Sequence, residues 1–292
     1  KELSEIERKR ERQEILEFQK ESAQQYEKNK QYYEKNRAIY RNSIRKLTEK
    51  LRICLETQDE TFPEMATHGK INPREVWKAV YLDNPRVFER KEEVEIPGFS
   101  VDMLIDASSS RKQMQEQIAA QAYVLAESLE ECGIPAQIYS YCSIRGFTVM
   151  RIFKDYEEEQ VGNELFGYVA AGNNRDGLAV RAAAAGLLKR DEENKILIVL
   201  SDGRPNDIVV NRPNSRNPRP YFGDYGTKDT AMEVRHLRNA GVSVLGVFTG
   251  EEGDLQAERR IFGKDFAYIR RIDNFSAVVG RYLKKQLEET CN

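Results

Sequence analysis

The sequence predicts an α/β fold, in which a mostly parallel sheet is flanked by helices and preceded by a helical N-terminal extension. From Phe99 onward, apolar runs of strand length alternate with amphipathic runs of helix length. Two of the apolar runs, 99–106 and 195–202, are almost continuous, as is typical of strands covered on both faces. Residues 1–57 contain neither Gly nor Pro and are rich in Glu, Lys, Arg and Gln, which favour helix.

Size and composition limit the classes of function. The 292 residues suit one large domain or one domain with an appendage, and 46 basic against 48 acidic residues indicate no nucleic-acid partner. No apolar run approaches the roughly 20 residues that span a bilayer, and no secretory signal is visible. Four cysteines without a CxxC spacing and only two histidines argue against structural zinc and favour free thiols in a reducing cytoplasm.

The N-terminal extension, 1–57, has two parts. Its beginning is almost wholly polar and sustains no heptad pattern, so we do not predict a long coiled coil. Its end carries a one-sided apolar stripe at spacings of three and four, formed by Ile44, Leu47, Leu51 and Leu55. This stripe either docks on the main domain or binds a partner. We favour docking for the stripe and keep partner binding open for the polar beginning.

Residues 58–98 are predicted to be a connector with one short helix. The segment is interrupted by one glycine and three prolines: Gly69, Pro73, Pro85 and Pro97. The run 71–82 has the pattern of a short helix with Pro73 near its first turn. We expect its single tryptophan, Trp77, to be a packing residue.

The main domain, 99–292, reads as alternating helices and strands. Helices are expected at 113–132, 177–190, 227–240 and 275–289, and further strands at 136–143, 147–153, 242–248 and 265–272. Arg145-Gly146 separates two strands and predicts a tight hairpin. The pattern indicates a doubly wound, Rossmann-like sheet, in which ligands bind beyond the carboxyl ends of the strands.

Polar side chains follow the two most apolar strands at these ends. Asp106 ends the first, and Ser108 and Ser110 follow at a D-x-S-x-S spacing that can turn three oxygens toward one point. Asp202 follows the second strand, in the sequence SDG. Carboxylate and hydroxyl oxygens are hard ligands that suit Mg²⁺ or Mn²⁺. The alternative is that Asp106 caps a helix and the serines are ordinary loop residues.

A third loop, GNNRDGLAV, precedes an alanine-rich helix. Its Asp176 is placed either to cap that helix or to bring a third carboxylate to the metal, and both interpretations stay open. A third carboxylate would make the local charge negative, which favours capture of the cation and weakens attraction for an acidic ligand. Asp176 therefore either binds the ion directly or steers a basic or polar partner.

Taken together, these motifs resemble the von Willebrand factor A domain and its metal-ion-dependent adhesion site (MIDAS). Asp106, Ser108, Ser110 and Asp202 match that site residue by residue, whereas Asp176 stands where the common pattern has threonine. With an aspartate at this position, the loop Asn174-Arg175-Asp176-Gly177 resembles the branch of the family that contains the cobaltochelatase CobT subunit and NorD-type nitric oxide reductase activation proteins. Three further stretches support the branch: SDGRPND, YGTKDT and HGKINPREV.

The resemblance implies a non-catalytic binding protein with bound Mg²⁺ or Mn²⁺. In related pairs the A-domain protein is an adaptor for a MoxR-type AAA+ ATPase, in activation of a target metalloenzyme or in metal insertion. Docking would be bridged by the metal, with no nucleic acid and no membrane span involved. We expect a partner-binding rim around the metal that consists of Asn174, Arg204, Asn206, Asp207 and Tyr225.

Residues 203–227 are expected to form a long irregular loop directly after the metal loop. Its arginines, Arg212, Arg216 and Arg219, either form a basic rim or belong to a simple surface insertion. Asp229 is expected in a loop or at a helix start.

Two other classes of function remain as alternatives. Three carboxylates around Mg²⁺ or Mn²⁺ could also catalyse the hydrolysis of a phosphodiester, although Ser108 and Ser110 would have no role in that reaction. An adhesion-type A domain is the second alternative. The absence of a visible signal sequence and of disulfide-like cysteines counts against it.

Overall fold

A six-stranded sheet forms the centre of the computed structural model, which describes residues 5–58, 64–90, 98–144, 146–158, 160–210, 219–249 and 252–289. The strand order is β11-β10-β7-β4-β5-β6, and every neighbouring pair is parallel except β5 and β6. The strands are β4 (Phe99–Asp106), β5 (Ala136–Ile144), β6 (Phe147–Lys154), β7 (Asn194–Ser201), β10 (Val242–Phe248) and β11 (Phe266–Tyr268). The predicted α/β architecture is confirmed.

The order of the strands creates a switch point between β4 and β7. From β4 the chain adds β5 and β6 on one side, and it then returns to place β7, β10 and β11 on the other. The register pairs Ile105 with Leu200, so Asp106 and Ser201 end adjacent strands at the same edge of the sheet. Crevices that bind ligands form at such points.

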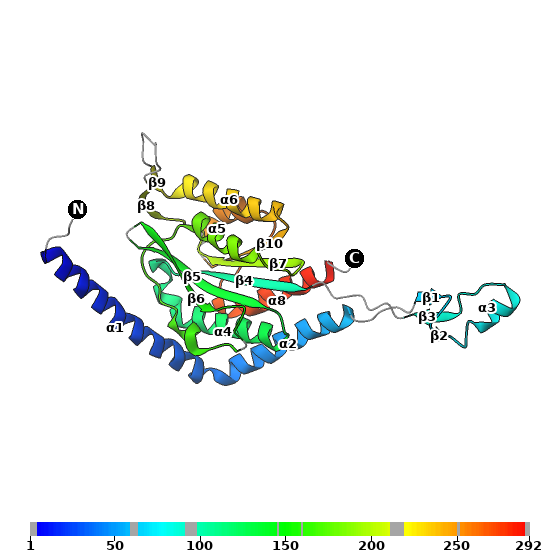
Figure 1. Ribbon diagram of the computed structural model, residues 1–292. Coiled ribbons are helices and arrows are strands. Elements are labelled where there is room, and N and C mark those ends of the chain that lie inside the picture. The colour runs from blue at the N-terminus through cyan, green and yellow to red at the C-terminus, as the bar shows by residue number, and fades with distance from the viewer. Residues whose placement is uncertain are drawn as a thin grey trace.

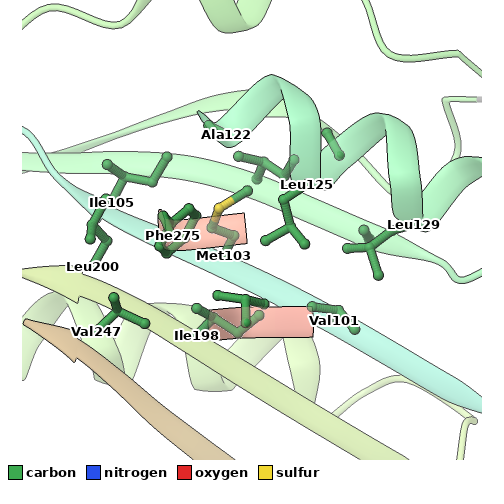
Figure 2. Close-up of a cluster of buried hydrophobic side chains, with 14 of the residues drawn as sticks. Val101, Met103, Ile105, Ala122, Leu125, Leu129, Ile198, Leu200, Val247 and Phe275 are labelled. Atoms are coloured by element: carbon green, nitrogen blue, oxygen red, sulfur yellow. The ribbon is translucent and has the colours of Figure 1, made fainter. Parts of the chain in front are cut away.

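Helices cover both faces of the sheet (Figure 1). α4 (Gln115–Glu131) and α8 (Phe275–Glu289) lie on one face, where Met103 and Ile105 pack with Leu125 and Phe275 (Figure 2). α5 (Asp176–Leu187), α6 (Gly223–Asn239) and α7 (Leu255–Phe262) lie on the other, over Leu104 and its neighbours. Because β4 has an apolar layer on each side, all of its residues are buried.

The N-terminal extension is two helices, α1 (Glu5–Lys35) and α2 (Arg37–Gln58). The helix is interrupted at Asn36, whose side-chain nitrogen donates to the carbonyl of Tyr32 at 2.9 Å, and such local bonds compete with regular helix. The predicted docking of the apolar stripe is confirmed. Leu47 and Leu51 are buried in the core that they share with α4 and α8, and Leu55 packs against it.

α1 contacts the sheet domain through its C-terminal half. Tyr33 stacks on Tyr40 and also contacts Tyr123 and Phe166, which forms a small aromatic core. Asn29 is fully buried, and its side-chain nitrogen donates to the carbonyls of Phe166 and Tyr168. The polar beginning of α1 leaves three large apolar side chains exposed: Ile15, Leu16 and Phe18.

The connector contains a small module that the sequence pattern did not reveal. Its strands are β1 (Glu64–Ala66), β2 (Lys70–Ile71) and β3 (Phe88–Arg90), paired in the order β1-β3-β2, and Figure 1 shows it apart from the large sheet. Its helix α3 (Val76–Tyr81) begins three residues after Pro73, because 73–75 form a turn. The expectation for Trp77 was wrong: its side chain is 50% exposed.

The described parts of the segment 203–227 contain regular elements, where an irregular loop was expected. β8 (Asp207–Val210) and β9 (Arg219–Tyr221) pair as antiparallel strands, and Gly223, Tyr225 and Thr227 belong to α6. Gly226 is required there by close packing, since a Cβ at this position would lie 2.9 Å from Pro205. Arg212 and Arg216 lie outside the described residues, and Arg219 is in β9.

Candidate functional site

The loop after β4 gathers three predicted site residues. One carboxylate oxygen of Asp106 accepts a hydrogen bond from the backbone N–H of Ser108 at 2.8 Å, and the other accepts from the Ser108 hydroxyl at 3.1 Å. The Ser108 and Ser110 hydroxyl oxygens are 2.8 Å apart. Asp106 and Ser108 are buried, whereas Ser110 is at the surface. The D-x-S-x-S spacing therefore brings its three side chains into one cluster.

The loop after β7 joins this cluster through Asp202. Its Oδ2 accepts a hydrogen bond from the Ser110 hydroxyl at 2.5 Å, and its Oδ1 accepts from the backbone N–H of Arg204 at 3.1 Å. Gly203 takes a positive φ of 67°, which lets the chain turn sharply after the strand. Two carboxylates and two hydroxyls thus converge from adjacent strand ends, and this set of hard oxygen donors fits a divalent cation such as Mg²⁺ or Mn²⁺.

Asp176 approaches the same edge from α5. It is the first residue of that helix, and the N-cap position is taken by Arg175, which makes no side-chain capping hydrogen bond. Its Oδ2 accepts a hydrogen bond from the Ser201 hydroxyl at 3.3 Å. Its Oδ1 is buried, and the side chains of Tyr141 and Asn174 lie close enough to Asp176 to lower the pKa of its carboxyl by hydrogen bonding.

Burial raises the pKa of two acidic groups of the site, and the charge of Asp176 adds to the rise at Asp106. Burial, followed by the charge of Asp176, raises the pKa of Asp106 to about 7, although the guanidinium of Arg111 opposes the shift. Burial also raises the pKa of Asp176 to about 6. A raised pKa means that the ionised form of the carboxyl group is destabilised in the fold. A bound cation would stabilise that ionised form.

One residue of this cluster was missed in the sequence. Arg111 directly follows Ser110 and is only 2% exposed. Its guanidinium lies 3.1 Å from Asp202 Oδ2 and 3.6 Å from Asp106 Oδ2, and it donates a hydrogen bond to the hydroxyl of Thr249, beyond the end of β10. An arginine in a polar stretch is usually exposed, so nothing in the local pattern revealed its burial.

Comparisons with known proteins agree with this architecture. The von Willebrand factor domain of the type V pili tip protein Mfa5 from Porphyromonas gingivalis superposes with a TM-score of 0.50 at 10% identity, over 68% of this chain and 98% of that domain. This chain has the von Willebrand factor A fold. No model of a known protein family matches it.

Two relatives resemble this chain in sequence. The uncharacterized protein YojO of Bacillus subtilis is 25% identical over 267 residues, which is 84% of this chain and 39% of YojO. Protein NorD of Brucella abortus is 28% identical over 133 residues, which is 44% of this chain and 19% of NorD. The chain therefore spans less than half the length of these relatives. In its described part, no helix is both long and apolar enough to cross a bilayer.

The predicted rim of the A domain divides into buried and exposed residues. Asn174 and Asn206 exchange backbone hydrogen bonds of 2.9 and 3.1 Å, and Asp207 forms a buried ion pair with Arg175 at 2.7 Å. Asn174 and Asp207 are thus positioned to hold loops together. Arg204 and Asn206 are exposed, and Tyr225 is half-buried in edge-to-face contact with Tyr221. Asp229 lies within α6 and accepts from the Tyr221 hydroxyl.

The arrangement of the acidic side chains bears on the hydrolase alternative. Within the described ranges, no three His, Cys, Asp or Glu side chains form a group that could hold a metal ion. Asp106 and Asp202 are bridged instead by serine hydroxyls and by Arg111. Two carboxylates and two hydroxyls therefore form the hydrogen-bonded cluster, and the guanidinium of Arg111 lies beside both carboxylates.

Proposed function

We propose that this A domain is a metal-dependent adaptor that binds a MoxR-type AAA+ ATPase and takes part in activating, or inserting metal into, a target metalloenzyme. The observation that carries the proposal is the hydrogen-bonded cluster of Asp106, Ser108, Ser110 and Asp202 at the sheet edge. The similarity to a protein named NorD supports the class of partner. Mg²⁺ or Mn²⁺ is the proposed cofactor.

In this proposal, the carboxylates and the hydroxyls of the cluster have different roles in binding the ion. The two carboxylates neutralise a divalent charge, and the serine hydroxyls supply further oxygen ligands. The bound cation would supply a Lewis-acidic position for an oxygen atom of the partner. Because Ser110 is exposed while Asp106 is buried, the open side of the cluster faces solvent, and Arg204 and Asn206, which follow Asp202 in the chain, are exposed as well. These two side chains and Tyr225 are our proposed partner contacts.

Asp176 tunes this site in our proposal. Its carboxylate is the third near the cluster, and it is close enough for its charge to raise the pKa of Asp106. Replacing Asp176 by threonine is expected to weaken Mn²⁺ binding and to alter the partner's affinity, which isothermal titration calorimetry measures for both ligands. If neither affinity changes, Asp176 has no part in the site.

The start of α1 is the proposed second contact with the partner. Ile15, Leu16 and Phe18 are exposed on a helix whose other end is fixed to the sheet domain through Asn29. Exposed apolar side chains on a charged helix are typical of a protein-binding surface. Replacing these three residues by serine is expected to weaken ATPase binding without changing metal affinity.

The proposal is tested by measuring ATPase binding as a function of metal. The MoxR-type ATPase of the same organism is titrated with the full chain in Mg²⁺ and again after EDTA treatment. Binding is expected in Mg²⁺, loss in EDTA and loss with Asp202→Ala. The matched control is Ser109→Ala. Ser109 lies between Ser108 and Ser110 in the sequence, but its exposed side chain is not part of the hydrogen-bonded cluster. Equal binding under all conditions would rule out metal-bridged docking.

A further inference from the structure

Arg111 is the most unusual group at the strand ends, because it places a permanent cation among the proposed metal ligands. Its side chain is almost fully buried, although the neighbouring Ser109 and Ser110 are exposed. A buried guanidinium is costly unless it is paired, and Arg111 has two carboxylates within ion-pair distance. Its position is therefore fixed by the same acidic groups that make the cluster suitable for a divalent ion.

The contacts of Arg111 overlap with those of the proposed ion at specific atoms. Oδ2 of Asp202 receives both the Ser110 hydroxyl and a terminal guanidinium nitrogen of Arg111. Oδ2 of Asp106 receives the Ser108 hydroxyl and faces Nε of Arg111 at 3.6 Å. A metal that coordinates these two oxygens would meet the positive charge of the guanidinium at close range, where like charges repel strongly.

The remaining contact of Arg111 lies on a third strand. Its other terminal nitrogen donates to the hydroxyl of Thr249, whose backbone N–H in turn donates to the carbonyl of Ser201 at 3.2 Å. Arg111 thus connects the ends of β4, β7 and β10. The side chain retains an uncharged anchor at Thr249 if its two ionic contacts are lost.

We propose that Arg111 is a built-in competitor of the divalent cation. Its guanidinium neutralises Asp106 and Asp202, stabilises the loops, and must give up its contact with Asp202 when the metal binds. This inference rests on the proposed metal site and adds that the site is tuned to weak, exchangeable binding. Metal loading would then be coupled to a movement of Arg111 and of the β10 end that it holds.

The test compares Mn²⁺ affinity and thermal stability in the full chain and in Arg111→Met. Methionine keeps much of the apolar volume but removes the charge. We expect the variant to bind Mn²⁺ at least about tenfold more tightly, in line with the size of charge-pair couplings at buried sites. In EDTA it should melt at a lower temperature than wild type, because two buried carboxylates lose their cation, and Mn²⁺ should raise its melting temperature more than that of wild type.

Two further variants separate competition from other effects. Arg111→Lys keeps the charge but lacks the planar fork, and it is expected to bind Mn²⁺ with intermediate affinity. Arg190→Met removes a positive charge just before β7, at the opposite end of the strand from Asp202, and should leave Mn²⁺ affinity unchanged. Circular dichroism in EDTA verifies that each variant is folded at the temperature of titration.

The outcomes distinguish this inference from the proposed function. Unchanged or weaker Mn²⁺ binding by Arg111→Met, with wild type binding Mn²⁺ normally, would overturn the competitor role and leave the metal site intact. If neither wild type nor any variant binds Mn²⁺ or Mg²⁺, the proposed metal site itself is wrong. Tighter binding with both Arg111→Met and Arg190→Met would indicate a general charge effect and would also overturn the competitor role.

Discussion

The hydroxyl of Ser110 donates to Asp202 Oδ2 at 2.5 Å, although the two residues are 92 positions apart in the chain. This contact links the loop after β4 to the loop after β7. Ser110→Ala removes both the link and a proposed ligand, and Mn²⁺ affinity is expected to fall at least about tenfold, as happens when even an outer-shell partner is lost from metal sites. Calorimetric titration measures the effect. Ser109→Ala is the control, and equal losses in the two variants would contradict a specific role for Ser110.

Asp102 makes the stability of the fold dependent on pH. It is fully buried in β4 and accepts hydrogen bonds from the hydroxyls of Tyr139 and Tyr156. Burial raises its pKa from 3.8 to about 6, although the two tyrosines and Arg190 oppose the shift. Because the protonated form is favoured in the fold, its stabilising contribution is complete below pH 3.8 and is lost as the pH rises through 6.

Asp102→Asn is therefore expected to change the pH profile of unfolding. Since each pKa unit is worth about 1.4 kcal/mol, the variant should gain about 2–3 kcal/mol relative to wild type between pH 4 and pH 7. Urea unfolding at several pH values measures this difference. Asp224→Asn alters an exposed carboxylate and should show a profile like that of wild type. A constant difference between Asp102→Asn and wild type at all pH values would contradict the assignment.

Asn29 fixes α1 to the segment that supports the loop of Asp106. Its side-chain nitrogen donates to the carbonyls of Phe166 and Tyr168 at 2.7 and 2.9 Å, and the Tyr168 hydroxyl donates to the carbonyl of Asp106 at 2.6 Å. Asn29→Ala leaves two buried carbonyls without this donor, and we expect a loss of about 2–3 kcal/mol in unfolding free energy. Asn42→Ala, on the exposed side of α2, should cost much less. Similar losses would show that α1 is not fixed in this way.

Gly280 of α8 allows α2 to approach closely. A Cβ at this position would lie 2.2 Å from Cδ1 of the buried Leu47. Gly280→Ala is expected to destabilise the fold by about 1–3 kcal/mol through overpacking. Combining it with Leu47→Ala should cost less than the sum of the two single changes, because the smaller side chain makes room. Gly186→Ala, where the nearest atom is 3.7 Å away on an exposed helix surface, is the matched control and should be neutral or stabilising. Strict additivity at positions 47 and 280 would contradict the close contact.

The parts of the fold with strong periodicity could be predicted from the sequence. The runs 99–106 and 195–202 are long and almost wholly apolar, so their identity as central strands and the contact between the loops that follow them, made by Ser110 and Asp202, followed from pattern and topology. Short elements gave no such signal. β8 and β9 have four and three residues, and α7 has eight, so each depends on neighbours that are distant in sequence.

Tertiary context also explains the errors within the predicted elements. Trp77 was expected to pack, yet the small module leaves its helix exposed on the side that carries the aromatic ring. Arg111 was missed for the opposite reason, since its burial depends on carboxylates that come from two different strands and on a hydroxyl from a third. Neither local composition nor periodicity carries information of this kind.

The packing of α2 has a practical consequence for dissecting the protein. Leu47 and Leu51 complete the core between α4 and α8, yet they precede the first strand of the sheet by about fifty residues. A recombinant fragment that starts at Phe99 would include every strand of the large sheet but would expose the apolar flanks of two helices to water. Such a fragment should aggregate or require detergent, so expression trials are best begun upstream of α2.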